Sequence, residues 1–554
     1  MISAANRQKL IDTLNIYSYD VLVIGGGITG AGIALDAISR GMSVALIDEQ
    51  DFSAGTSSRS TKLVHGGLRY LKQLQFGIVA EVGKERKVVY ENGIHITTPV
   101  GMLLPFYRGG QFGPKSTSMG LKLYDRLAGV RKEERRKMLN IKETLAYEPL
   151  LKKDGLLGGG HYIEYRTDDA RLTIEVIKRA IELGAVALNY AKAEHFIYDE
   201  DGQICGAQVL DQIHGEDITI EAKAVINATG PWVSETLEKD VQNDQKKHLL
   251  RTKGVHIVLD QSVFPLQQSI YFDAPDGRMI FAIPRDNKAY IGTTDTVFEG
   301  DSAHPKATDE DIAYLLEAMH YMFPDVKVSF KDVESTWAGV RPLIYEDGKD
   351  PSEISRKDEI WNAPSGLLTI AGGKLTGYRK MAENVVDLLV KRPYFKKFGP
   401  CITRELSLSG ATMLNEENFE AYISFKGKEA VDYGLTSAIG ESLTRKYGTN
   451  IDDLFKIKRV TGDDFVQRGL PVDLYLQVVY AMQYESAYTP ADVLVRRTGK
   501  LYFDIDTVKK YLDEIVSLMN DFLGYSDYEA DIKKEEMCRL IDEATHFAKE
   551  GMYE

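Results

Sequence analysis

The chain has 554 residues, of which 44% are hydrophobic and 27% charged, and its formal net charge at pH 7 is −14. Because one domain usually spans about 100–200 residues, this length and composition predict a soluble globular protein of two or three domains. The negative charge argues against a nucleic-acid-binding protein, and no run approaches the roughly 18–20 apolar residues that span a bilayer.

The start of the chain lacks the continuous apolar segment of a secretion signal. The three cysteines, Cys205, Cys401 and Cys538, lie far apart and form neither a CxxC metal motif nor a disulfide framework. Both features predict a protein of the reducing cytoplasm that binds no metal.

A strand–turn–helix–strand pattern follows. Residues 19–24 are a short apolar run that predicts a buried strand, and the sequence GGGITG at 25–30 follows without a break. Apolar residues then recur at helical spacing, and Gly41 stands where a helix usually ends. Residues 43–47 predict a second buried strand, which ends at Asp48. The pattern indicates a βαβ unit.

The turn of this unit has the glycine spacing of a dinucleotide site. Gly25 permits the tight turn, Gly27 lets the backbone approach a pyrophosphate, and Gly30 allows close packing of helix on strand. The helix N-terminus presents N–H groups to phosphates, and an acidic strand end accepts hydrogen bonds from ribose. The alternative is a glycine turn without a ligand. The predicted contacts are Gly25, Gly27, Ile28, Thr29, Gly30 and Asp48.

The middle of the chain predicts a further helix–strand unit and a hairpin. Asp168 or Asp169 caps a helix that Gly184 ends. Turn residues at 199–202 predict the hairpin, and residues 224–228 predict another buried strand.

Residues 250–345 are rich in β-branched and aromatic residues and predict a largely antiparallel sheet. Residues 367–371 predict a last buried strand, which enters a Gly-Gly-Lys turn. From about residue 405 the pattern is helical. One amphipathic helix covers 508–522 and ends at Gly524, and another covers 540–547.

Five segments resemble the FAD-dependent glycerol-3-phosphate dehydrogenase family. The longest is TSSRSTKLVHGGLRY at 56–70, and the others are NATGPW at 227–232, IGTTD at 291–295, GVRP at 339–342 and GGKLT at 372–376. The matches occur in the family's order, and VRRT at 495–498 extends them into the helical region. HGGLRY with GVRP and GGKLT is far more specific than the glycine fingerprint alone.

The resemblance implies that FAD oxidises sn-glycerol 3-phosphate to dihydroxyacetone phosphate through hydride transfer to flavin N5, with quinone as the electron acceptor. It also implies a mixed α/β (α+β) fold of the amine-oxidase-like kind. In this fold a Rossmann-like FAD-binding domain is interleaved with an antiparallel substrate-binding sheet domain, and a C-terminal helical domain follows. We assign 1–90, 160–250 and 345–398 to the FAD-binding domain, 91–159 and 251–344 to the substrate-binding domain, and 399–554 to the helical domain.

Members of the family attach peripherally to the inner face of the cytoplasmic membrane. The basic runs at 131–137 and 391–397 are candidate contacts with anionic lipid, and a solvated surface is the alternative. The oligomeric state stays open, a homodimer included. The role of the helical tail also stays open between three alternatives: docking on the membrane, contact with a second subunit, and capping of the fold.

The reaction needs cations for the phosphate group. Arg341 is the preferred clamp, because a partly buried guanidinium requires a partner and its fork matches a phosphate. The alternative is a structural pair with a carboxylate. Lys374 is a second cation, which could instead stabilise negative charge at the flavin N1–O2 end. The predicted substrate contacts are Arg69, Tyr70, Arg341, Arg356 and Lys374.

The reaction also needs a base for the substrate hydroxyl, and His65 is our choice because neutral imidazole accepts a proton near pH 7. Two alternatives stay open for His65, a hydrogen bond to flavin or loop backbone and covalent flavin attachment. We predict catalytic roles for His65, Arg341 and Lys374. The further predicted cofactor contacts are Ser57, Ser58, Lys62, His65, Gly66, Gly67, Gly230, Trp232, Gly373, Lys374, Leu375 and Thr376.

Three rival functions remain. A glycerol-3-phosphate oxidase passes electrons to oxygen, but such enzymes carry an insertion in mid-chain that this sequence lacks. An amine or amino-acid oxidase of the same fold needs one guanidinium for a carboxylate rather than several cations. A flavin-bound scaffold or sensor would show no turnover. A second nucleotide fingerprint is absent from the sequence, so the flavin is expected to take electrons directly from a small substrate rather than from NAD(P)H.

Overall fold

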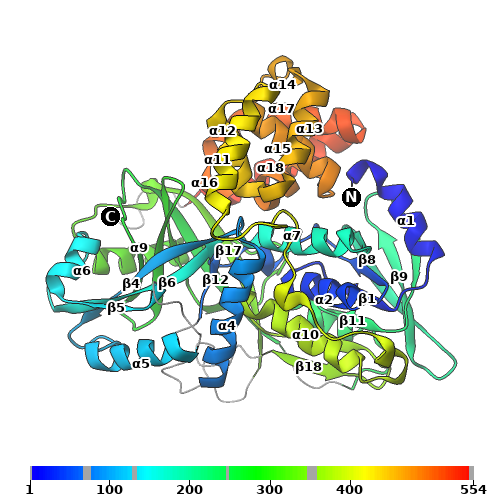
Figure 1. Cartoon of the computed structure of the whole chain (residues 1–554), viewed down its shortest axis with the longest axis horizontal. Coiled ribbons are helices and arrows are strands. Elements are labelled where there is room, and N and C mark those ends of the chain that lie inside the picture. Colours follow the sequence, from blue (N-terminus) through cyan, green and yellow to red (C-terminus); the bar gives the residue numbers. More distant parts are fainter. Residues whose placement is uncertain (1–2, 67–75, 128–133, 245–248, 346–357, 548–554) are drawn as a thin grey trace.

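The structure is a computed structural model that describes residues 3–66, 76–127, 134–244, 249–345 and 358–547. A six-stranded sheet with its helices and a ten-stranded sheet lie side by side, and a helical domain covers both (Figure 1). This architecture confirms the predicted mixed α/β fold with a C-terminal helical domain.

In the described part of the chain, the six-stranded sheet has the order β18-β19-β11-β1-β2-β7. Its strands are β1 (Val21–Ile24), β2 (Val44–Ile47), β7 (Val186–Leu188), β11 (Val225–Asn227), β18 (Glu359–Asn362) and β19 (Leu368–Ala371). Neighbouring strands are parallel, except that β18 pairs antiparallel with β19. Helix α2 (Ile28–Ser39) joins the fully buried strands β1 and β2, which confirms the predicted βαβ unit.

The two faces of this sheet bury different layers. Val21 and Val23 of β1 belong to a core with three helices, whereas Leu22 and Ile24 belong to a core with a three-stranded meander. The helices are α2, α7 (Asp169–Glu182) and α10 (Tyr378–Leu389), and the meander comprises β8 (Ala191–Tyr198), β9 (Ile204–Asp211) and β10 (Asp217–Glu221). Because alternate side chains of a strand point to opposite faces, β1 is the middle of a three-layer unit.

Local predictions in this unit are confirmed. Asp168, rather than Asp169, is the N-cap of α7, and its carboxylate accepts a hydrogen bond from the Arg171 backbone N–H at 3.1 Å. β8 and β9 form the predicted antiparallel hairpin.

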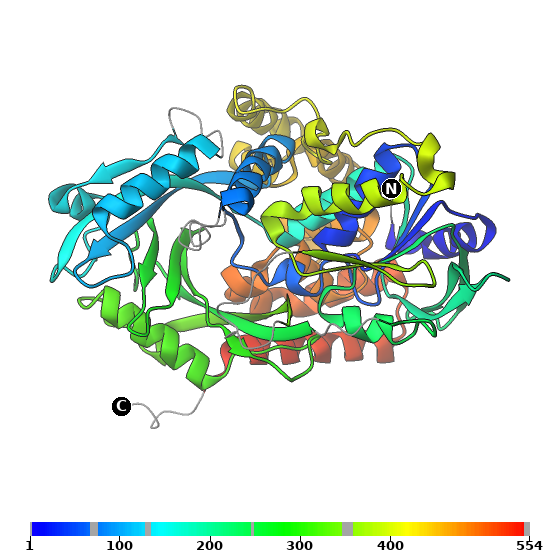
Figure 2. The ribbon, with the colours of Figure 1, turned by 90° about the horizontal axis from the view of Figure 1, so that it is seen from below.

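Within the described residues, the ten-stranded sheet has the order β16-β12-β15-β14-β13-β4-β6-β3, with β17 paired to β12 and β5 to β6. Its strands are β3 (Leu63–Val64), β4 (Thr97–Tyr107), β5 (Lys137–Leu139), β6 (Leu156–Thr167), β12 (Leu249–Asp260), β13 (Ser269–Asp273), β14 (Met279–Arg285), β15 (Lys288–Gly292), β16 (Thr296–Val297) and β17 (Val333–Ile344). All pairs are antiparallel except β4 with β13, where the first half of the chain meets its middle (Figure 2).

The antiparallel sheet predicted at 250–345 is therefore confirmed, but helix α9 (Asp309–Met322) interrupts it. Thr308 caps α9 through a hydrogen bond from the Asp311 backbone N–H, and the Leu315 and Met319 side chains pack against one face of the sheet. The prediction missed this helix. The other α-helices of the described residues before the C-terminal domain are α1 (Arg7–Ile16), α4 (Phe76–Asn92), α5 (Pro114–Leu127), α6 (Ile141–Tyr147) and α8 (Val233–Leu237).

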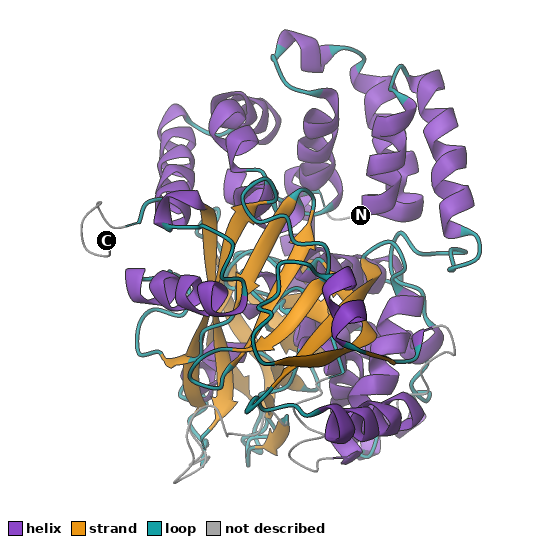
Figure 3. Ribbon diagram, turned by 90° about the vertical axis from the view of Figure 1, so that its left-hand side faces the viewer, coloured by secondary structure: helices purple, strands orange, loops and turns teal. Residues whose placement is uncertain are grey.

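The C-terminal domain is helical, as predicted, and stands over the sheets (Figure 3). Its helices are α11 (Phe419–Ala430), α12 (Ser437–Tyr447), α13 (Ile451–Thr461), α14 (Asp464–Gln467), α15 (Val472–Tyr484), the π-helix η11 (Asp492–Arg497), α16 (Lys500–Phe503), α17 (Ile505–Leu523) and α18 (Asp527–Thr545). Gly524 ends α17 in the left-handed conformation, as predicted, whereas Phe547 lies beyond the end of α18. The domain shares a core with the sheet face opposite α9, where Tyr290 and Trp337 are buried.

The assigned domain boundaries remain a prediction. The six-stranded sheet falls within the ranges assigned to the FAD-binding domain, but β3 and most of β6, which lie in the same ranges, join the ten-stranded sheet. Among the described residues, none of the helices has both the length and the apolar composition needed to cross a bilayer.

Candidate functional site

Segments from distant parts of the sequence surround one pocket of about 1220 Å³, a volume that includes the open solvent at its mouth. They are the β1–α2 turn, the segment after β2, strand β8, the end of β11 with α8 and the residues after it, the end of β17 and the turn after β19. The lining residues are Ile24, Gly25, Gly27, Ile28, Thr29, Asp48, Glu49, Gln50, Ala54, Gly55, Thr56, Ser57, Ser60, Ala193, Ala228, Thr229, Gly230, Pro231, Trp232, Thr236, Lys239, Pro342, Gly372, Gly373, Lys374 and Leu375. The pocket lies at the carboxyl ends of the parallel strands, where ligands of such sheets bind.

Two glycines of the β1–α2 turn are required by its geometry. Gly25 has φ = +113°, and a Cβ atom there would lie 2.5 Å from the Ala228 carbonyl oxygen. A Cβ at Gly30 would lie 1.8 Å from the Gly25 carbonyl oxygen. The turn can therefore form only where both positions lack a side chain.

The first turn of α2 points into the pocket. Gly27 is the N-cap and makes no side-chain capping hydrogen bond, and the Ile28 N–H donates to Ser57 Oγ at 2.9 Å. Helix N-termini with N–H groups directed at a pocket bind phosphate groups. Gly27, Ile28, Thr29 and Ser57 together form a cradle of the kind that holds a pyrophosphate.

Asp48 stands beside this cradle. Its carboxylate accepts hydrogen bonds from the backbone N–H groups of Gly26 at 2.6 Å and Gln50 at 2.8 Å. Burial raises the pKa of Asp48 to about 7, the two N–H donors oppose the shift, and the nearby carboxylates of Asp51 and Glu49 add to it. A ribose hydroxyl that donates to this carboxylate would favour its ionised form.

Hydrogen bonds join further segments around the pocket. Thr56 Oγ1 donates to the Val340 carbonyl at 2.6 Å, and Thr376 Oγ1 donates to the His65 carbonyl at 3.2 Å. Lys374 and Trp232 also line the pocket. The lining thus combines a phosphate cradle with a cation and an aromatic ring, a set that fits a dinucleotide cofactor.

Arg341 directly precedes Pro342 in strand β17 and is not itself among the described residues that line the pocket. Its guanidinium donates to Thr293 Oγ1 at 2.9 Å and to Asp295 Oδ1 at 3.0 Å. Its side chain is 18% exposed, which confirms the predicted partial burial. A Cβ at Gly254 would lie 2.3 Å from the guanidinium, so this glycine lets Arg341 lie flat across the sheet.

His256, which the sequence analysis did not single out, lies on the same face of the sheet. It is buried, hydrogen-bonded to Thr61 Oγ1 at 3.0 Å through Nε2 and stacked on Trp337. Burial, with smaller contributions from Arg341 and Lys62, holds the pKa of His256 well below its ordinary value, so its imidazole is neutral. Its place on the same face as Arg341 depends on the pairing of β12 with β17, which no local sequence pattern marked.

Several predicted contacts lie beside the pocket rather than in its lining. Lys62 Nζ bonds Asp169 Oδ1 at 2.6 Å, and Ser58 is buried. The His65 ring meets Phe281 edge to face, and the Gly66 N–H donates to the Glu164 carboxylate. Thr376 binds the His65 backbone, and Gly30 packs beneath the turn. Gly67, Arg69, Tyr70 and Arg356 lie outside the described residues.

Sequence reasoning also missed part of the pocket wall. Glu49, Gln50, Ala193, Thr236 and Lys239 line it, and no motif marked them. Ala193 lies on β8 and Lys239 follows α8, so the three-dimensional fold alone brings them to Asp48.

Comparison with known proteins agrees with this geometry. Residues 20–379 match the family "FAD dependent oxidoreductase", and residues 401–530 match "C-terminal domain of alpha-glycerophosphate oxidase". Two curated relatives, the aerobic glycerol-3-phosphate dehydrogenases of Staphylococcus aureus strains bovine RF122 / ET3-1 and MRSA252, are each 56% identical over 549 residues, 98% of either chain.

Solved structures of similar fold also include flavoproteins named for glycerol 3-phosphate. The glycerol-3-phosphate dehydrogenase from Bacillus halodurans complexed with FAD superposes with a TM-score of 0.86 at 42% identity and covers 100% of both chains. The L-alpha-glycerophosphate oxidase from Mycoplasma pneumoniae has a TM-score of 0.55 at 16% identity, covering 68% of this chain and 95% of its own, and shares the fold. The chain therefore belongs to the aerobic glycerol-3-phosphate dehydrogenase family of FAD-dependent oxidoreductases.

Proposed function

We propose that this chain oxidises sn-glycerol 3-phosphate to dihydroxyacetone phosphate. The observation that carries the proposal is the partly buried guanidinium of Arg341, which directly precedes the pocket-lining Pro342 and bonds Thr293 and Asp295. When bound, FAD supplies the hydride acceptor for this reaction. The chain's own residues must then bind the phosphate group, orient C2 and accept the hydroxyl proton.

Phosphate recognition falls to Arg341 and Lys374. The planar fork of Arg341 already binds two oxygen atoms, Thr293 Oγ1 and Asp295 Oδ1, and a phosphate presents the same type of acceptor. Lys374 lines the pocket on the turn after β19 and adds a second positive charge. Two cations suit a dianion better than the single carboxylate of an amino acid, which disfavours the amino-acid oxidase alternative.

Proton removal falls to His65, which follows strand β3. Thr376 binds both the N–H and the carbonyl of the His65 backbone, at 3.1 and 3.2 Å, and so ties this histidine to the Gly-Gly-Lys turn. The next residue, Gly66, is held by Glu164, which pairs with Arg86 at 2.9 Å. The backbone that carries the imidazole is thus held in place, which favours the positioning that a general base needs.

The electron acceptor in this proposal is a membrane quinone, reached from a cytoplasmic protein attached peripherally to the inner face of the membrane. Among the described basic residues, Lys391, Lys396 and Lys397 are exposed and near one another in sequence, a pattern that attracts anionic lipid. Washing membranes with high salt or alkali should release the protein without detergent. Release by detergent alone would contradict peripheral attachment.

Anaerobic titration tests the main proposal. Glycerol 3-phosphate should bleach the flavin absorbance of the holoenzyme, whereas glycerol and amino acids at equal concentration should not. Bleaching by amino acids alone would identify an amino-acid oxidase, and no bleaching by any of them would identify a binding protein. Reoxidation of the bleached enzyme should be faster with a soluble quinone than with oxygen. The reverse order would favour an oxidase.

A further inference from the structure

We infer that the C-terminal helical domain is part of the cofactor-binding machinery: Arg497, acting through Asp51, positions the segment at residues 48–58 that lines the FAD pocket. In this assignment Arg497 is a positioning residue that does not contact the cofactor. The inference concerns FAD retention only, so it does not depend on which substrate is oxidised.

The segment at 48–58 has two sides. Asp48, Gln50 and Ser57 face the pocket, whereas the Asp51 side chain, between them in sequence, points away from it and is fully buried. Phe52 is also buried, and its ring packs closely against Gly26. A Cβ atom at Gly26 would lie only 2.6 Å from this ring. The backbone that supplies the ribose and phosphate contacts is therefore anchored from behind.

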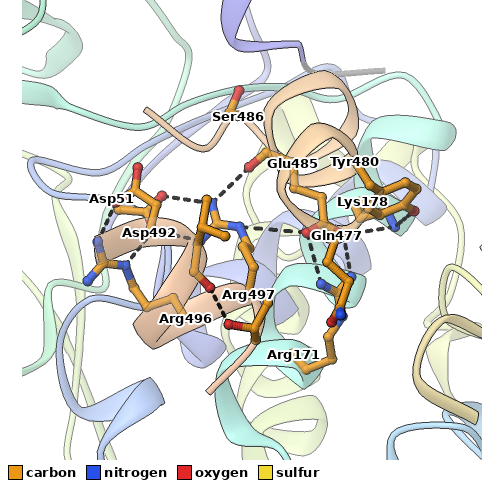
Figure 4. Close-up of polar contacts among 12 residues, drawn as sticks. Asp51, Arg171, Lys178, Gln477, Tyr480, Glu485, Ser486, Asp492, Arg496 and Arg497 are labelled. Atoms are coloured by element: carbon orange, nitrogen blue, oxygen red, sulfur yellow. Dashed lines mark hydrogen bonds and ion pairs between the residues drawn. The ribbon is translucent and has the colours of Figure 1, made fainter. Parts of the chain in front are cut away.

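The anchor belongs to the C-terminal domain (Figure 4). Arg497 donates hydrogen bonds to both oxygens of the Asp51 carboxylate, from Nη1 to Oδ2 at 2.6 Å and from Nη2 to Oδ1 at 2.8 Å. Arg496 Nε donates to Oδ2 at 2.5 Å, and Asn189 Nδ2 donates to Oδ1 at 2.9 Å. Burial alone would raise the pKa of Asp51, but the two guanidinium groups hold it below its usual range.

The two arginines are themselves fixed within the C-terminal domain. Arg497 Nη2 also donates to the Glu485 carbonyl at 2.8 Å, and Arg496 pairs with Asp492. The Asp492 carboxylate receives the Tyr488 and Thr489 backbone N–H groups at 2.6 and 2.9 Å. Arg497 is not exposed at all. Breaking one partner of such a buried cluster leaves a charge unpaired, which is strongly unfavourable.

A shift of Asp51 and its two arginine partners must therefore move the residues that line the pocket. The Ser53 N–H donates to the Gly26 carbonyl at 3.1 Å, and Ser53 has φ = +68°, a conformation that its neighbours must hold in place. If Asp51 shifts, Gly26 and Ser57 shift with it. The Gly26 N–H donates a hydrogen bond to the Asp48 carboxylate, and Ser57 Oγ accepts one from the first turn of α2. The coupling is reciprocal, so bound FAD should in turn stabilise η11.

The test uses Arg497→Lys holoenzyme, which keeps the charge but loses the fork. Arg40→Lys is the matched control, because Arg40 is also buried and bonded to two aspartates, Asp36 at 2.8 Å and Asp387 at 2.7 Å, but lies at the end of α2 away from the pocket. FAD release is followed by the rise in flavin fluorescence, and unfolding by far-ultraviolet circular dichroism.

Wild type and Arg40→Lys should release FAD only as they unfold. Arg497→Lys should release FAD below its unfolding temperature, and at a fixed temperature below both transitions its release rate should rise roughly 5- to 150-fold, the usual range of coupling between sites. Release that coincides with unfolding, at a rate within about twofold of Arg40→Lys, would overturn the inference.

Should Arg497→Lys fail to fold, wild-type protein decides the question by amide hydrogen exchange with and without FAD. Bound FAD should slow exchange at residues 488–497 in the C-terminal domain, whereas exchange in α13 should change little. Equal exchange at 488–497 in the two samples would show that the anchor and the pocket are not coupled. Because no substrate is present, failure here leaves the glycerol 3-phosphate proposal untouched.

Discussion

The guanidinium of Arg341 lies 3.0 Å from the carboxylate of Asp295, in the turn that links β15 to β16. The sequence left two readings of Arg341 open, a phosphate clamp and a structural ion pair, and this pair exists. The side chains are only 18% and 12% exposed. The pair is therefore largely buried, and its carboxylate can hold the guanidinium in orientation and compete with an incoming phosphate.

Arg341→Ala should raise the KM for glycerol 3-phosphate at least about tenfold, because a charge-assisted hydrogen bond contributes ~1.5–3 kcal/mol. Arg341→Lys should recover only part of the loss, since an ammonium lacks the fork. Plain glycerol, measured in the same steady-state assay, should be a very poor substrate that loses little further. An equal loss for both substrates would make Arg341 structural.

Asp295→Asn should lower the KM for glycerol 3-phosphate by about two- to fivefold, as expected from ~0.5–1 kcal/mol for a partly exposed pair. The amide keeps an acceptor for Arg341 but removes the negative charge that competes with phosphate. Steady-state kinetics at low ionic strength gives the measurement. A raised KM would mean that Asp295 acts mainly by orienting Arg341.

His65→Gln should slow flavin reduction by substrate about 10²- to 10⁴-fold while leaving substrate affinity nearly unchanged, because a general base acts on the transition state. Stopped-flow absorbance under anaerobic conditions separates the two quantities. His256→Gln is the matched variant, since it removes the imidazole that lies on the same sheet face as Arg341. A large loss in His256→Gln, with none in His65→Gln, would reassign the base.

Gly30→Ala should reduce both stability and FAD content. The added methyl would lie 1.8 Å from the Gly25 carbonyl oxygen, and overpacking against backbone costs about 1–3 kcal/mol or more. Thermal unfolding and the flavin-to-protein absorbance ratio measure the two effects. Gly77→Ala in α4, where a Cβ meets nothing within 4 Å, should be neutral or slightly stabilising.

His95 should make the fold sensitive to acid. Burial, only partly offset by Glu175, lowers the pKa of this histidine to about 4 from 6.5. Between pH 6.5 and 4 the unfolded chain binds a proton at this position and the folded chain does not, so the free energy of unfolding should fall by roughly 3 kcal/mol as the pH drops. Above pH 6.5 His95 contributes no pH dependence.

Urea unfolding of wild type and His95→Gln at several pH values isolates this contribution, because carboxylates titrate equally in both proteins. The variant should lose less stability than wild type between pH 6.5 and 4. Parallel curves would show that the His95 environment accepts the charged imidazole.

Local chemistry made four strands of the six-stranded sheet and its glycine turn predictable, but not the order of the strands. Strand β1, the glycine turn and the Asp168 cap each depend on residues within a few positions of one another. Helix α9 was missed because its apolar residues stand between strand-forming segments of similar composition. A short apolar pattern does not by itself distinguish these two structures.

Long-range contacts explain the rest of what sequence could not supply. The VRRT segment was noted as part of the resemblance, but its role rests on Asp51, which lies 446 positions from Arg497. Likewise, the register of β12 with β17 sets Thr252 opposite Arg341, and no local pattern encodes that register. Side chains that act through such partners become visible only in three dimensions.

The strand order of the six-stranded sheet has a consequence for synthesis on the ribosome. Its central strand β1 is flanked by β2 and by β11, and β11 pairs in turn with β19, which ends at Ala371. The nascent chain therefore exposes the Gly25–Gly30 turn and β2 long before β11 (Val225–Asn227) and β19 (Leu368–Ala371) emerge. Domains with such non-local pairing fold slowly and stay exposed to aggregation. A truncated transcript or a stalled ribosome would yield a chain that contains the glycine fingerprint but cannot build its pocket.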